Sequence, residues 1–76
     1  MMGAMPDEPL TLRQRLAGNV RYLRNERGWS QEDLAARSGL HHNQISRIER
    51  TRHSVGLDIV EKLALAFGVP ARDLLD

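Results

Sequence analysis

The side chains best suited to chemistry lie close together, within residues 42–47, and all of them can form hydrogen bonds. They are His42, Asn43, Ser46 and Arg47. Arginine can bond guanine through two hydrogen bonds, and asparagine can do the same for adenine. Because Ile45 and Ile48 would turn to the opposite side of a helix, the four polar groups would share an outer face. The spacing therefore predicts a helix that reads base edges in the major groove of double-stranded DNA.

Donors suited to phosphate flank this predicted helix. Gln31 lies at the expected start of the preceding helix, where free backbone amides favour an anion. At the other end the chain supplies Arg50, Arg52 and His53. We expect these four residues to contact phosphate and so fix the position of the protein along DNA. An ordinary first-turn residue at 31, and solvated charges at 50 and 52, are the alternatives.

Residues 30–50 predict two short helices joined by a tight turn. Ser30 can cap the first helix, and Asp33 three residues later completes a capping box. Gly39 suits the left-handed backbone that ends such a helix. The second helix is expected over residues 42–50. This arrangement would present the polar face of the second helix to a partner and bury its isoleucines.

Three further helices are expected around this pair. A Thr11 cap and an apolar stripe at helical spacing predict a first helix that Gly28 ends. The stripe consists of Leu12, Leu16, Val20 and Leu23. A second stripe marks a helix after Gly56, and Pro70 opens a short last one. No segment alternates with period two, so the predicted fold is all-α, a compact bundle of about five short helices.

Composition narrows the classes of function. The chain has 76 residues and no cysteine, which predicts one domain with no disulfide and no thiolate metal site. No apolar run approaches the ~20 residues that span a bilayer. Between residues 11 and 53 the chain has nine arginines and four acidic residues. This excess of positive charge suits a polyanionic partner, and an ordinary solvated surface explains it equally well. No enzymatic site and no cofactor are expected.

The remaining aromatic and imidazole side chains have simple expected roles. His41, His42 and His53 have no cysteine or close carboxylate beside them, so a metal site is not expected. Protonation of these histidines would add positive charge and strengthen DNA binding at lower pH. Trp29 and Tyr22 are expected to pack inside the protein rather than stack on bases.

Three blocks of the sequence resemble the phage-repressor and Cro-like helix-turn-helix family, also called the Xre family. They read VRYLRNERGWSQEDLAARSGL (20–40), ISRIER (45–50) and LALAFGVPARDLL (63–75). The resemblance implies a lambda-repressor-like fold whose helices 2 and 3 form the helix-turn-helix of a cytoplasmic transcriptional regulator. It also implies a structural salt bridge between Arg24 and Glu49. The small size looks like that of restriction–modification controllers or of the DNA-binding half of a longer protein.

The sequence departs from the family pattern at three places. His41 stands where a serine or threonine usually caps helix 3, and Val55-Gly56 stands where Pro-Ser often precedes helix 4. Thr51 stands where glycine is frequent, and threonine is expected to resist the positive φ that glycine adopts there. The departures bear on the path of residues 50–56 and not on the fold.

The expected organisation has one domain and one self-association surface. Residues 1–10 are predicted to be a disordered lead or a cloning remnant, and residues 11–76 the DNA-binding domain. Leu65 and Ile59, with Leu74 or Leu75, would form an apolar patch that suits a homodimer; completing the core is the alternative. A dimer would set two recognition helices about 34 Å apart on a near-palindromic operator.

Two functions are consistent with this organisation. As a transcriptional regulator, the protein would repress by occluding a promoter, or activate through contact with RNA polymerase. The alternative is an antitoxin or protein-interaction module with secondary DNA binding.

Overall fold

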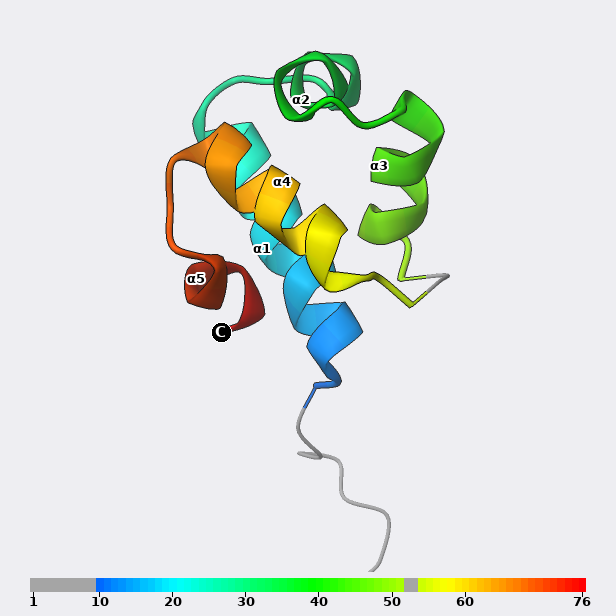
Figure 1. Ribbon diagram of the computed structural model, residues 1–76, viewed down its shortest axis with the longest axis vertical. Helices are drawn as coiled ribbons and strands as arrows, with labels where there is room; N and C mark the ends of the chain where they lie inside the picture. The colour runs from blue at the N-terminus through cyan, green and yellow to red at the C-terminus, as the bar shows by residue number, and fades with distance from the viewer. Residues whose placement is uncertain (1–9, 52–53) are drawn as a thin grey trace, which may run out of the picture.

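The computed structural model describes residues 10–51 and 54–76, which form five helices and no strand (Figure 1). The helices are α1 (Leu12–Glu26), α2 (Gln31–Ser38), α3 (His42–Glu49), α4 (Leu57–Phe67) and α5 (Ala71–Leu75). The all-α prediction is therefore confirmed. The predicted lead at the N-terminus, apart from its last residue, and the two predicted phosphate contacts Arg52 and His53 lie outside the described residues.

The helix ends follow the capping signals of the sequence. The Thr11 hydroxyl accepts the Gln14 N–H at 3.1 Å, and the Gln14 side chain accepts the Thr11 N–H at 2.8 Å. Ser30 and Asp33 form the same reciprocal pair at 3.0 and 2.8 Å. Gly39 ends α2 with a φ of 76°, the left-handed conformation expected of it. Local sequence thus determines where the helix-turn-helix begins and turns.

The Ser30 cap also affects the titration of Asp33. Hydrogen bonds from the Ser30 backbone N–H and hydroxyl lower the pKa of the Asp33 carboxyl, because they stabilise its ionised form. The stabilisation is present above the pKa of Asp33 in the unfolded chain and is lost as pH falls through the lowered folded value. The hydrogen bonds between Ser30 and Asp33 consequently stabilise the start of α2 at neutral pH.

The hydrophobic core draws on every helix, with α1 at its centre. Helix α1 packs against α3, α4 and α5, while α2 packs against α3 and α4. The largest fully buried side chains are Val20, Leu34, Ile45, Leu63 and Leu74. The Asn19 side chain donates to the Leu74 carbonyl at 2.9 Å and ties α5 to α1. Helix α3 is therefore held by α1 and α2, and its orientation depends on both.

Two predicted packing positions are wrong. Leu12 is 62% exposed, because it lines an open hollow at the edge of the core, beside Leu57 of α4 and Leu75 of α5. Tyr22 is 64% exposed, because it lies two residues beyond the buried Val20 and so on the other side of α1. Trp29 does pack as predicted: its ring stacks on Phe67 with 5.7 Å between ring centres.

Thr51 adopts a φ of 55°, which is a left-handed conformation, directly after α3. The chain therefore takes the path that glycine would take, although threonine was expected to resist it. A β-branched side chain in this conformation costs on the order of 1–2 kcal/mol. The turn is stabilised by the Thr51 N–H, which donates to the Ile48 carbonyl at 3.1 Å.

Replacing Thr51 by glycine should raise the free energy of unfolding by about 1 kcal/mol. The substitution removes the strain, and the greater freedom of glycine in the unfolded chain offsets only part of that gain. Urea denaturation would measure the change. Thr51→Ala is the matched control and should gain less, since it keeps a Cβ atom. A glycine variant no more stable than the alanine variant would contradict the assigned strain.

Candidate nucleic-acid interface

Helix α3 has one buried and one exposed side. Ile45 and Ile48 are buried in the core, with exposed fractions of 0% and 6%. The polar residues predicted to contact bases lie on the other side: His42, Asn43 and Arg47 are exposed, and Ser46 is half-buried. Three side chains that can donate or accept hydrogen bonds are thus available to a partner along one face of a helix.

The first turn of α3 is capped by a residue that the sequence reasoning missed. His41 precedes the helix, but its side chain makes no capping hydrogen bond to the helix. Instead, the Gln44 side chain accepts the backbone N–H of His41 at 2.9 Å. This bond is the half of a capping box that a glutamine side chain supplies, and the sequence signals it by a glutamine three residues after the cap position. The ring of His41 takes no part in the cap and is exposed to solvent.

The other end of α3 is anchored by a buried ion pair. Glu49 is only 5% exposed, and its carboxylate accepts from Arg24 Nε at 2.7 Å and Nη2 at 3.0 Å. The remaining Arg24 nitrogen, Nη1, donates to the Trp29 carbonyl at 2.8 Å. The hydrogen bonds to Glu49 raise the pKa of Arg24 above its ordinary value, outweighing the effect of its burial. This is the pairing that the family resemblance implies, and it joins α1 to α3.

Gln31 lies between the anchored end of α3 and its exposed start. Its side-chain Nε2 donates to Glu49 Oε1 at 3.1 Å, and its Oε1 lies 3.1 Å from His42 Nε2. The sequence predicted a phosphate contact for Gln31 but neither of these partners. Nothing in the local sequence signals them, because the residues are 18 and 11 positions apart. The structure therefore brings together one predicted phosphate contact and one predicted base contact.

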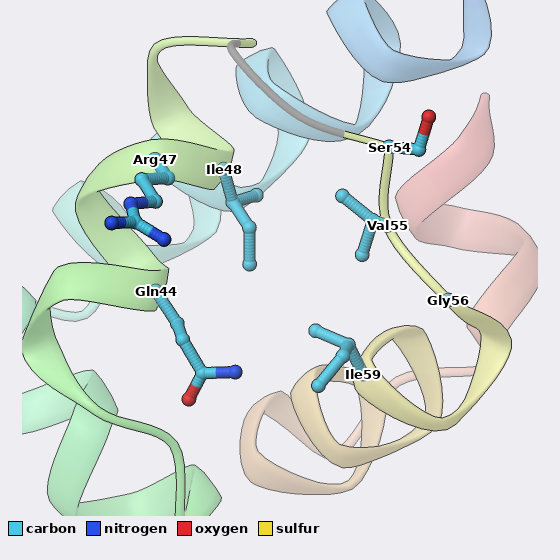
Figure 2. Close-up of a pocket in the computed structure, with 7 residues that line it drawn as sticks. All are labelled: Gln44, Arg47, Ile48, Ser54, Val55, Gly56 and Ile59. Carbon is cyan, nitrogen blue, oxygen red and sulfur yellow. The ribbon is translucent and has the colours of Figure 1, made fainter.

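Beside the exposed face, α3 borders a shallow hollow of about 190 Å³. Figure 2 shows Ile48, Val55 and Ile59 around it, with Gln44 and Arg47 along the α3 side. The apolar floor joins α3 to the start of α4, where Gly56 takes the cap position. Arg50 follows the last residue of α3 and is exposed.

Within residues 10–51 and 54–76, other kinds of site lack support. No group of three or more histidine, aspartate or glutamate side chains is placed to hold a metal ion there. In the same part of the chain, none of the helices has the length and apolarity needed to cross a membrane.

The turn between α2 and α3, with the exposed face of the second helix, defines a helix-turn-helix protein. A family model described as helix-turn-helix (HTH_3) matches residues 20–74. The chain belongs to this family of Xre-type regulators. It is a DNA-binding transcriptional regulator, and its curated relatives are transcription factors and controller proteins, not enzymes.

Individual relatives cover most of the chain. A hypothetical transcription factor of Neisseria meningitidis is 46% identical over 71 residues, which are 93% of this chain and 66% of the relative. The chain thus spans just under two thirds of that protein. Control protein C.BamHI of Bacillus amyloliquefaciens is 47% identical over 58 residues, covering 75% of this chain and 72% of the relative.

Solved structures show the same fold. The crystal structure of the Neisseria transcription factor covers all of this chain and 86% of its own, with 43% identity and a TM-score of 0.85. The restriction–modification controller C.AhdI of Aeromonas hydrophila covers 82% of this chain and 94% of its own, with 35% identity and a TM-score of 0.78. The lambda-repressor-like architecture is therefore confirmed.

Removing one partner of the buried ion pair should destabilise the protein strongly. Arg24→Ala leaves the Glu49 carboxylate buried without its cation, which costs about 3 kcal/mol or more. Urea denaturation followed by circular dichroism would measure the loss. The double variant Arg24→Met with Glu49→Leu removes both charges and should be more stable than Arg24→Ala alone. If the double variant were the less stable of the two, the unpaired charge would not be the cause.

Proposed function

We propose that this regulator binds double-stranded DNA sequence-specifically, with α3 in the major groove, as a homodimer on a near-palindromic operator. The observation that carries the proposal is the division of α3, whose isoleucines are buried while His42, Asn43 and Arg47 are exposed. Packing does not account for these exposed groups, and their chemistry matches base edges. The protein would act on DNA in the cytoplasm.

Base recognition and phosphate contact fall to different residues in this proposal. His42, Asn43, Ser46 and Arg47 contact bases. Gln31, Arg50, Arg52 and His53 contact phosphate, the last two on sequence grounds alone. Gln31 can serve this purpose because its amide carries two hydrogens, of which Glu49 accepts one. The second hydrogen is then available to a phosphate oxygen at the start of α2, where backbone amides also point outward.

Self-association would use the exposed side of α4 near α5. Leu65 is 82% exposed and borders an open hollow that Glu61, Ala64, Val69 and Ala71 also line. Of the patch expected from sequence, Leu74 is fully buried and Ile59 lines the hollow beside α3 instead. In Figure 1, α5 and α3 lie on opposite sides of the view with α1 and α4 between them. A twofold contact near Leu65 would thus leave both recognition helices free.

The names of the relatives suggest the biological setting. C.BamHI is named a control protein, and C.AhdI is named a restriction–modification controller. By similarity, we propose that this chain controls transcription of a small operon by occluding a promoter or by touching RNA polymerase. These relatives favour transcriptional control over the antitoxin alternative.

Arg47 and Arg50 provide a matched test of base and phosphate contacts. Arg47→Ala should weaken binding to the selected operator by about 1–3 kcal/mol and relax the preference for one base pair. Arg50→Ala should weaken all sequences alike and lower the salt slope by about one. Fluorescence anisotropy on operator and scrambled duplexes, over a range of salt concentrations, would measure both. An operator affinity unchanged in Arg47→Ala would refute the assigned reading face.

The dimer surface can be tested with two exposed leucines. Leu65→Glu should convert the dimer to a monomer, because it places a carboxylate in an apolar contact. Sedimentation equilibrium of the free protein would detect this, and binding to a full operator should weaken accordingly. Leu57→Glu is the matched control, since Leu57 is 77% exposed on a different hollow. Dissociation by Leu57→Glu but not by Leu65→Glu would move the interface elsewhere.

A further inference from the structure

Four side chains form a continuous series of hydrogen bonds from the core to the exposed start of α3. Arg24 donates to Glu49, Gln31 Nε2 donates to Glu49, and Gln31 Oε1 lies 3.1 Å from His42 Nε2. Arginine can only donate, and an ionised carboxylate can only accept. The direction of every bond in the series therefore follows from the buried ion pair.

This direction determines which nitrogen of His42 carries the proton. Because Glu49 requires a donor, the Gln31 amide turns its Nε2 toward Glu49 and its carbonyl Oε1 toward His42. A carbonyl oxygen can only accept, so the Nε2 of His42 must be protonated. Neutral imidazole has one N–H, and its other nitrogen is an acceptor. In neutral His42 the Nδ1 atom is that acceptor.

We infer that His42 reads its base through Nδ1, and that the preferred base there changes when the ring is protonated. Neutral His42 presents an acceptor, which pairs with the amino groups of cytosine or adenine in the major groove. Protonated His42 presents a donor at Nδ1, which pairs with N7 or O6 of guanine, N7 of adenine or O4 of thymine. Cytosine, which offers only an amino donor, and guanine, which offers only acceptors, are therefore the two bases that the two forms separate most clearly. The inference rests on the proposed function, because it requires the start of α3 to lie in the major groove.

Protonation leaves the rest of the series unchanged. In the imidazolium form both nitrogens donate, so Nε2 still donates to Gln31 and only Nδ1 changes its role. The charged and titratable residues of α2, of α3 and of the turn between them are Glu32, Asp33, Arg37, His41, Arg47 and Glu49. Arg24 of α1 joins this group through its bond to Glu49. His41 also carries an imidazole, so a control must separate its effect on overall affinity from the base preference of His42.

The decisive experiment selects binding sites from randomised duplex DNA at about pH 8 and at about pH 5.5, with ionic strength held constant. These values lie on either side of the range in which histidine ordinarily titrates. One position in each half-site should shift from cytosine toward guanine as the pH is lowered. The relative affinity for the two bases should shift roughly fivefold to tenfold, the value of one hydrogen bond.

His42→Asn is the matched control, because asparagine does not titrate in this range and His41 is retained. Its selected site should be the same at both pH values. The same selected base at both values for the unmodified protein would overturn the inference and leave the proposed function standing. A base change that persists in His42→Asn would also overturn it. If no sequence were enriched at either pH, the proposed sequence-specific binding itself would fail.

A second measurement requires no DNA. Nitrogen-15 shifts of the His42 ring in the free protein at about pH 8 distinguish a protonated Nε2 from a protonated Nδ1. The series of hydrogen bonds requires Nε2 to be protonated. A ring protonated at Nδ1 would overturn the inference whatever the outcome of the selection.

Discussion

The buried pair of Arg24 and Glu49 is the interaction on which the geometry of this small protein depends. A carboxylate that is 5% exposed can remain ionised only if its lost hydration is replaced, and Arg24 replaces it with two hydrogen bonds. The same carboxylate accepts from Gln31, so one group joins α1, α2 and α3. Arg21 adds a hydrogen bond of 3.2 Å to the Glu49 carbonyl at the end of α3. Helix α3 is therefore placed by directional bonds as well as by apolar contact.

This division of roles lets the exposed face of α3 vary independently of the fold. Ile45, Ile48 and Glu49 hold the helix, and none of them is available to a partner in solution. His42, Asn43 and Arg47 are exposed and contribute little to the core. Substitutions among the exposed residues should alter what is bound without altering how the helix sits. A helix-turn-helix scaffold can thus support regulators with different operators.

The sequence predicted the helices well because their signals are local. Ser30 with Asp33 and the glycine at 39 determine the limits of α2 within a few residues of chain. Exposure was predicted less well, because it depends on how fully neighbouring helices cover a side chain: Leu12 continues an apolar stripe but lines an open hollow at the edge of the core. The partners of Gln31 were not predicted at all. They are brought near by the fold, and periodicity says nothing about residues 18 positions apart.

In the proposed complex, Gln31 would link a phosphate contact with a base contact. Its amide is bonded to a buried carboxylate on one side and to an exposed imidazole on the other. A phosphate that binds the free amide hydrogen of Gln31 would therefore help to hold the His42 ring in place against a base. In the same way, a base bound by the His42 ring would help to hold the Gln31 amide in place for the phosphate. Affinity and specificity would then not be independent at this end of α3. Arg47 has no corresponding link to Glu49 among the described residues, so its contribution should be closer to additive.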